Sequence, residues 1–411
     1  MKYRHYLPIP SALFTLLVAG EAHAGGTWTF CMNWAISATD KGAGEDYHTN
    51  TTTMFARGVR VVVDHSDWED PLETNASEVD GCFSFTTTSD ANTGFRVKMF
   101  AETRIGVDGR LHLHAYPTNA DRTAKLVPSW LILANPGGVP RKIVLQNTPD
   151  PVSNMIAWTT FGAYWIDHLS NPRAPAFELH AVPQKCPLDA NNCTVVDDMN
   201  IHPDGVQKKF LIGHETGHWL KNAWASPFTF SNYDVSASEP ECAWDGDGDH
   251  ALRSREGNAA AFNEGFAHFL STLMYNDHSQ PNAGAKFRYY KDVDDVDAYS
   301  DLVADEYIVD VEGGVGNVDG GPNRWMETQC PTTAGHGVEM DWQRFYWDYR
   351  TDSGVRVPTH SELFQHVADA IENNPWEPET AWQHLRDSLF SSNLLLYARW
   401  NLKSAQNGTD H

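Results

Sequence analysis

Two hydrophobic patterns divide the chain, one before and one after about residue 120. Between residues 26 and 115, short apolar or alternating runs such as GVRVVVDH and GFRVKMFAET are separated by groups of Asp, Asn, Gly and Ser. Runs of this kind are typical of β-strands joined by turns. Within this region, TNASEVDGCFSF predicts an extended segment, an Asp-Gly turn and a returning strand. We therefore expect β structure throughout this part of the chain.

After the segment 117–128, which predicts a linker, the pattern becomes mainly helical. Apolar residues at helical spacing predict helices over 153–169, around GVQKKFLIGHETGHWLKNA and over 256–276, and a mainly helical part from about residue 338. The runs AFELHAV and TVVDDMNI predict two strands. Strands first and helices later, without regular alternation, indicate an α+β fold with a second domain over residues 127–411.

The first 24 residues have the pattern of a secretory signal peptide. Lys2 and Arg4 give a positive start, ALFTLLVAG is a short apolar core, and AHA ends the segment with small residues. These features predict cleavage after Ala24 and a secreted or periplasmic protein. The apolar core is too short to span a membrane, and no later apolar run is long enough, so we expect no membrane span.

The cysteines fit an oxidising compartment. The chain has 6 of them, an even number, and no two form a CxxC pair. In an exported protein this pattern favours disulfides over a thiolate metal site. We expect the pairs Cys31–Cys82, Cys186–Cys193 and Cys242–Cys330.

The formal net charge of -24 restricts the partners of the protein. Nucleic acid and anionic membrane surfaces would be repelled, so we expect neither as a partner. Solubility outside the cell explains the charge, and calcium binding is the alternative. In DGDGDHALRSRE, the acidic residues match EF-hand ligand positions, but His250 stands where that loop needs glycine. The candidate calcium ligands are Asp245, Asp247, Asp249 and Glu256, and a polar turn before a helix explains the same residues.

The motif HETGH at residues 214–218 indicates a metal site with histidine ligands. On an α-helix, His214 and His218 lie on one face, so both imidazoles can bind one ion, and zinc accepts such ligands. Glu215 is about 100° round the helix and can face a water at the metal as a general base. A chance match on a surface helix is the alternative. The flanking runs FLI and WL instead predict a buried helix, on which unpaired polar side chains would be costly.

A second motif, NEGFA, follows at residues 263–267. HETGH followed by a helix that carries NEGFA resembles the gluzincin class of zinc metallopeptidases, of which thermolysin is the best-known type. The resemblance implies a zincin-like catalytic domain in which Glu264 is the third zinc ligand and Ala267 lets the two helices pack closely. The interval between His218 and Glu264 is longer than in the thermolysin type, which indicates an inserted loop.

Further residues can support such a site. Thermolysin-type enzymes stabilise the oxyanion with a downstream His or Tyr, and the candidate here is His336, in AGHGVEMDW; the alternative is a loop histidine with no role. Glu339 and Asp341 can accept hydrogen bonds from a ligand histidine. His268, one turn after Glu264 on the same helix face, is a rival ligand, a supporting group or a buried core histidine.

The N-terminal region has a resemblance of its own. Its strand and turn pattern is similar to the transthyretin-like regulatory β-sandwiches found beside secreted enzymes. This resemblance covers the β region alone and implies a β-sandwich domain over residues 25–120. A Cys31–Cys82 bridge would fasten such a sandwich.

These observations lead us to expect an exported zinc metallopeptidase that cleaves peptide bonds in protein or peptide substrates. Two alternatives stay open. One is a non-catalytic binding or adhesion protein on a zincin scaffold, which the intact set His214, Glu215, His218 and Glu264 disfavours. The other is a zinc hydrolase that acts on a bond other than a peptide, which has the same metal and base.

Overall fold

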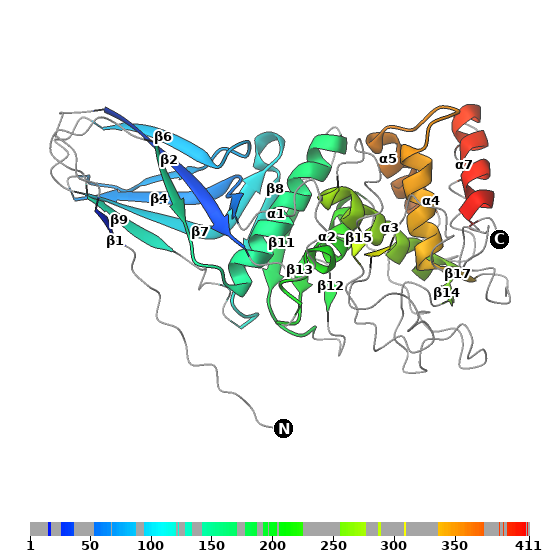
Figure 1. The fold of residues 1–411 in the computed structure, drawn as a ribbon, viewed down its shortest axis with the longest axis horizontal. Coiled ribbons are helices and arrows are strands. Elements are labelled where there is room, and N and C mark those ends of the chain that lie inside the picture. Colours follow the sequence, from blue (N-terminus) through cyan, green and yellow to red (C-terminus); the bar gives the residue numbers. More distant parts are fainter. Residues whose placement is uncertain are drawn as a thin grey trace, which may run out of the picture.

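The computed structural model combines sheets with helices and confirms the α+β class. Strands gather at one end of an elongated molecule and the C-terminal helices lie at the other (Figure 1). The structure describes residues 15–17, 26–36, 53–66, 68–87, 94–120, 122, 128–133, 142–170, 177–186, 192–195, 197–203, 205–224, 255–276, 287–288, 308–309, 336–373, 386, 389, 393–407 and 409.

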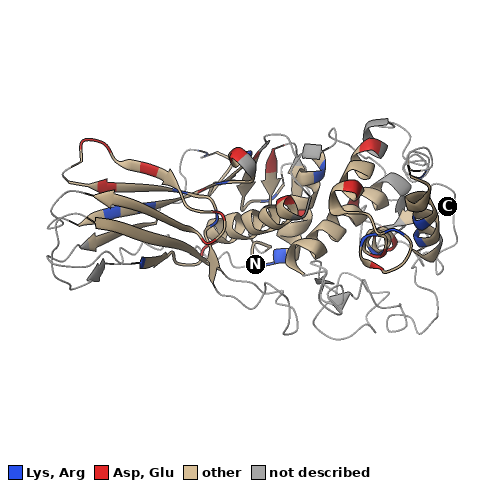
Figure 2. Cartoon of the chain, turned by 90° about the horizontal axis from the view of Figure 1, so that it is seen from above, with Lys and Arg blue, Asp and Glu red and all other residues tan. Residues whose placement is uncertain are grey.

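Charged residues of both signs are distributed along the described chain (Figure 2). They occur on the strands at one end and on the helices at the other, so the charged side chains are not confined to one part of the fold. Among the described helices, none is both long and apolar enough to cross a membrane.

The smaller sheet is built round one long strand. Strand β2 (Gly26–Ala35) pairs antiparallel with β6 (Cys82–Thr87) and β3 (Thr53–Phe55), and parallel with β10 (Lys142–Gln146). Its alternation places Phe30, Met32 and Trp34 in the core. β10 therefore brings a segment from beyond the predicted linker back to the first strand of the N-terminal region.

The larger sheet joins strands from both parts of the chain. Its long strand β7 (Phe95–Ile105) pairs with β4 (Val59–His65) along one edge. Along its other edge it pairs with β9 (Ser129–Leu133) and then with β8 (Leu111–Ala115). The strands β8, β11 and β13 follow in order, and β12 ends that path. The members are β1 (Thr15–Leu17), β4 (Val59–His65), β5 (Leu72–Asn75), β7 (Phe95–Ile105), β8 (Leu111–Ala115), β9 (Ser129–Leu133), β11 (Phe177–Val182), β12 (Cys193–Val195) and β13 (Asp198–Asn200).

The two sheets meet through aromatic side chains. Phe95 on β7 lies 5.2 Å from Trp28 on β2 and 5.4 Å from Phe85 on β6, measured between ring centroids. All three rings belong to one hydrophobic cluster, or pack against it, together with the buried residues of β4. The N-terminal strands thus form two layers that share a core, which is the arrangement of a sandwich.

The predicted linker at 117–128 lies between β8 and β9, and both strands pair with β7. The predicted boundary between the N-terminal and second domains therefore falls within one continuous sheet. The domain limits stay a prediction. β1 belongs to the predicted signal peptide and pairs parallel with β9, so a chain that begins after Ala24 lacks this strand.

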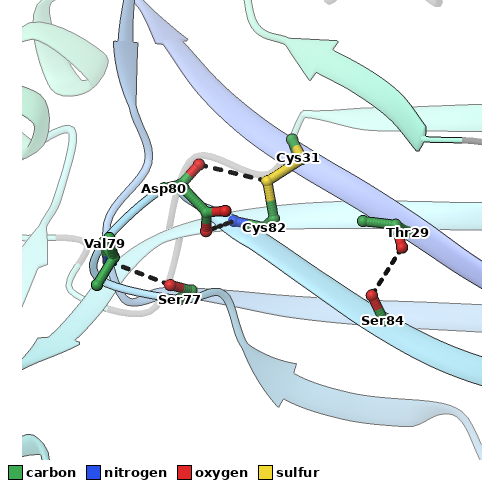
Figure 3. The surroundings of a disulfide bond; sticks show 7 residues. All are labelled: Thr29, Cys31, Ser77, Val79, Asp80, Cys82 and Ser84. Atoms are coloured by element: carbon green, nitrogen blue, oxygen red, sulfur yellow. Dashed lines mark hydrogen bonds between the residues drawn. A yellow bond between two sulfur atoms is a disulfide. The ribbon is translucent and has the colours of Figure 1, made fainter.

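Two of the three predicted disulfides are present. Cys31 and Cys82 are directly paired residues on β2 and β6, and their bridge joins the two strands (Figure 3). Two residues further along, Thr29 Oγ1 lies 2.7 Å from Ser84 Oγ across the same pair of strands. Cys186 and Cys193 form the second bridge. The third predicted pair, Cys242 and Cys330, lies outside the described residues.

TVVDDMNI forms a hairpin rather than the single strand that the sequence predicts. β12 and β13 pair antiparallel, with Thr194 opposite Met199. The alternation of apolar and polar residues shows that a segment is extended, but it does not show where the chain changes direction. The turn between β12 and β13 was therefore not predicted.

The helices follow their predicted positions closely. α1 (Pro151–Ser170) covers the larger sheet, and Asp150 caps it by accepting hydrogen bonds from the backbone N–H groups of Val152 and Ser153, at 2.9 and 3.0 Å. The other helices are α2 (Lys209–Trp224), α3 (Asn258–Tyr275), α4 (Glu339–Thr351), α5 (His360–Asn373) and α7 (Leu394–Asn407). Short strand pairs are β14 (Arg255–Gly257) with β17 (His336–Val338), and β15 (Phe287–Arg288) with β16 (Ile308–Val309).

Small residues let α3 lie against its two neighbours. A Cβ on Gly217 of α2 would lie only 3.1 Å from the Cα of Ala267, so the two backbones are in close contact there. A Cβ on Gly265 would lie 2.7 Å from the backbone oxygen of Glu339 on α4. The role given to Ala267 in close helix packing is consistent with this geometry. α3 is thus held between α2 and α4, and its polar residues face both.

Candidate metal centre

Helices α2 and α3 bring together the three residues that the sequence predicts as metal ligands. The Oε2 atom of Glu264 lies 3.0 Å from Nε2 of His214 and 3.0 Å from Nε2 of His218. The two Nε2 atoms are 3.1 Å apart. The three side chains form a group that could hold one metal ion.

This group has the properties that a zinc ion requires. Zinc bonds to imidazole nitrogen and carboxylate oxygen are about 2 Å long, so ligand atoms that share one ion lie about 3 Å apart. The side chains of His214 and Glu264 are 2% and 4% exposed, and that of His218 is 13% exposed. Burial lowers the pKa of His214, which favours the neutral imidazole that binds metals. The residues therefore fit zinc, with His218 on the side nearest solvent.

A chain of hydrogen bonds begins at Nδ1 of His214, the ring nitrogen that does not face His218 and Glu264, and orients the ring. Nδ1 of His214 lies 3.2 Å from Nδ1 of His268, and Nε2 of His268 lies 3.1 Å from Oε2 of Glu339. A carboxylate only accepts, so His268 donates from Nε2 to Glu339 and its Nδ1 accepts from His214. The Nε2 lone pair of His214 is then directed at the other ligand atoms. Burial, with the nearby His214, lowers the pKa of His268 to about 4, so His268 is neutral as this arrangement requires.

These contacts favour a supporting role for His268 among its alternatives. The ring contacts His214 and Glu339, and it is not part of the candidate ligand group His214, His218 and Glu264. Glu339 was expected to accept directly from a ligand histidine, but it acts through His268. Asp341 is buried on the same first turn of α4.

The second carboxylate oxygen of Glu264 is also held. Nδ2 of Asn263 donates to Oε1 of Glu264 at 3.1 Å, and Nζ of Lys221 donates to Oδ1 of Asn263. Lys221 is fully buried, and burial lowers its pKa to about 8 although the charge of Glu264 acts in the opposite direction. One oxygen of Glu264 thus faces the histidines while the other is fixed through α2.

Glu215, the predicted general base, is buried beside the last strand of the larger sheet. The Thr194 hydroxyl on β12 lies 2.8 Å from Oε2 of Glu215 and 3.0 Å from its backbone oxygen. Thr194 therefore connects the edge of the sheet to α2, the helix that carries His214 and His218. No role was predicted from the sequence for Thr194, Lys221 or Asn263. Thr194 lies far along the chain from Glu215, and the link from Lys221 through Asn263 to Glu264 forms only when α2 packs against α3.

Other predicted site residues are placed only in part. His336 begins β17, and its backbone pairs with Gly257 just before α3, but its side chain is not described. Glu256 lies on β14, also without a described side chain, and Asp245, Asp247 and Asp249 lie outside the described residues. The oxyanion role of His336 and the calcium site stay predictions.

No family model matches the chain, and no curated protein matches it.

Proposed function

We propose that the protein is a zinc-dependent metallopeptidase that hydrolyses peptide bonds in protein or peptide substrates. The observation that carries this proposal is the convergence of His214, His218 and Glu264 on one point, with Glu215 next to the first ligand. The order HETGH and then NEGFA, which resembles the gluzincin class, supports it. Zinc, when bound, supplies a Lewis acid and lowers the pKa of a bound water.

The residues of the chain have separate roles in this proposal. His214, His218 and Glu264 hold the metal. Glu215 accepts a proton from the attacking water and passes it to the leaving amine. The Thr194 hydroxyl, 2.8 Å from Oε2, holds the Glu215 carboxylate in one orientation. His336 is proposed as the donor to the oxyanion.

The position of β12 favours an extended peptide as substrate. β12 ends the path of the larger sheet, and among the described strands it pairs only with β13. Its other edge can accept an added strand, which is a common way to bind peptides. Because Thr194 of β12 contacts Glu215, a peptide on this edge would pass next to the proposed base. This observation favours a peptide bond over the other bonds that a zinc hydrolase can cleave.

The alternative of a binding protein on the same scaffold is less well supported. A site without catalysis needs neither a buried carboxylate next to the ligands nor a hydroxyl that orients it. Both are present as Glu215 and Thr194. We also propose that the protein is exported after cleavage of the N-terminal signal peptide, which the two disulfides support.

Glu215→Gln tests the proposal, because glutamine keeps the size of the side chain but cannot act as the base. We expect the variant to keep its zinc while turnover on an unbiased peptide library falls by about 100-fold or more. Glu73→Gln, on the surface strand β5, is the matched control and should cleave as the wild type does. Equal turnover in both variants would remove Glu215 from the mechanism, and zinc binding without any peptide cleavage would favour the binding protein.

A further inference from the structure

A second group of histidines and carboxylates lies on the larger sheet, apart from the α2–α3 centre. On β8, His112 and His114 alternate with Leu111 and Leu113, so they share the face opposite the buried leucines. The register places Glu178 opposite His112 and His180 opposite His114 on β11. Four potential ligands thus stand as two neighbouring pairs on one face of the sheet.

The ligand atoms of these side chains converge. Oε1 of Glu178 lies 2.8 Å from Nε2 of His114, 3.3 Å from Nε2 of His180 and 3.9 Å from Nδ1 of His112. Nδ1 of His112 lies 3.3 Å from Nε2 of His114. The ligand atoms of His114, Glu178 and His180 thus form a group that could hold one metal ion, and Nδ1 of His112 lies next to this group.

Two of the histidines have a carboxylate at their other ring nitrogen. Nε2 of His112 lies 2.8 Å from Oε1 of Glu102 on β7. Nδ1 of His180 lies 3.2 Å from Oδ1 of Asp198 on β13. A ligand histidine in a protein metal site usually donates its second N–H to such an acceptor, which fixes the ring and its tautomer.

Arg122 disfavours the tautomer of His180 that this arrangement needs, because it contacts the same ring nitrogen as Asp198 does. Its Nη1 lies 3.1 Å from Nδ1 of His180, and its Nη2 lies 2.5 Å from Oδ2 of Asp198. Arginine only donates, so the first contact favours the proton on Nε2 of His180. A metal at Nε2 selects the other tautomer, in which Asp198 accepts from Nδ1.

Acidic and aromatic side chains surround the group. Oε1 of Glu102 lies 2.8 Å from His112, and Oε1 of Glu178 lies 2.8 Å from His114. The ring of Tyr116 stacks on that of His114, with 5.8 Å between the ring centroids.

We propose that His112, His114, Glu178 and His180 form a second metal site, which binds Zn²⁺ and ties β8 to β11. Imidazole-rich sets with one carboxylate suit zinc and its neighbours among the transition metals. A network of paired histidines and carboxylates without metal is the alternative. It leaves three imidazoles side by side, with the His112 and His114 ring centroids only 3.9 Å apart, an arrangement that a shared cation stabilises.

The test is the zinc content of the whole protein after equilibration with a zinc buffer, for the wild type and four variants. We expect two zinc ions per chain in the wild type and one in either His180→Ala or His214→Ala. Glu178→Gln should raise the Kd of the sheet site at least about tenfold. His168→Ala, at an exposed position on α1, is the matched control and should keep both ions.

The outcomes separate this site from the α2–α3 centre. One ion that is lost in His214→Ala and kept in His180→Ala would overturn the second site. One ion that is lost in His180→Ala and kept in His214→Ala would support it while removing the α2–α3 centre. Zinc should also raise the melting temperature of the wild type more than that of Glu178→Gln. Because Glu178 is 51% exposed, this variant should fold, and equal shifts in both proteins would contradict the proposal.

Discussion

His268 Nδ1 lies 3.2 Å from His214 Nδ1, and this contact leaves Nε2 of His214 to face His218 and Glu264. The carboxylate of Glu339, 3.1 Å from Nε2 of His268, fixes the direction of donation along this series of hydrogen bonds. Helix α4 thereby contacts the candidate metal centre through Glu339 and His268, although none of its residues belongs to the candidate ligand group. The arrangement explains why a histidine and a glutamate, both fully buried, lie together in the core.

The first prediction concerns this support. In His268→Ala the Nδ1–H of His214 loses its acceptor, so the ring is no longer held with Nε2 toward the metal. We expect zinc affinity at the centre to fall about 10- to 100-fold, with metal still bound when zinc is in excess. Competition with a chelator of known affinity measures the change. His168→Ala is the control, and an unchanged affinity in His268→Ala would show that His214 is oriented by other contacts.

The second prediction concerns Thr194. Thr194→Val keeps the shape of the side chain but removes the hydroxyl that lies 2.8 Å from Glu215. We expect turnover to fall about tenfold, the scale of one hydrogen bond to a charged group, while zinc content stays unchanged. Thr27→Val, in the exposed Thr27–Thr86 contact of the smaller sheet, is the matched control. A loss of zinc in Thr194→Val would mean that Thr194 supports the ligands rather than the base.

The third prediction concerns the Cys186–Cys193 disulfide. Cys193 begins β12 and directly precedes Thr194, so the bridge anchors the strand that contacts Glu215. Replacing both cysteines by serine should cost about 2–3 kcal/mol of unfolding free energy and also lower turnover. Replacing Cys31 and Cys82 should lower stability without changing turnover per folded molecule, because that bridge lies in the sandwich. Unfolding and peptide assays on both variants give the comparison. Equal turnover per folded molecule in the two double variants would show that the anchoring of β12 does not affect catalysis.

Part of this site could be predicted from the sequence because its geometry is local. A spacing of four residues on a helix places His214 and His218 together without any tertiary information. Glu264 lies far along the chain and was identified through the resemblance of NEGFA to a known motif. Thr194 reaches the site from a strand, and no local pattern marks it. Glu339 was expected to accept from a ligand histidine, but its contact through His268 depends on how α4 packs against α3.

For the fold, too, local features could be predicted from the sequence and tertiary contacts could not. The runs GVRVVVDH and GFRVKMFAET predicted β structure where β4 and β7 lie, because one face of each strand is buried. They could not show that β10 returns to pair with β2, or that β7 pairs with both β9 and β8. The alternation in LHLHA likewise places His112 and His114 on one face, but it does not identify β11 as the neighbouring strand.

The central claim is that zinc held by His214, His218 and Glu264 supports peptide hydrolysis. It is tested most directly by peptide cleavage in metal-depleted protein as zinc is returned, for the wild type and Glu264→Ala. The account predicts no cleavage after depletion, recovery in the wild type as the α2–α3 centre fills, and no recovery in Glu264→Ala because its third ligand is missing. Cleavage that survives depletion, or that returns equally in Glu264→Ala, would contradict it.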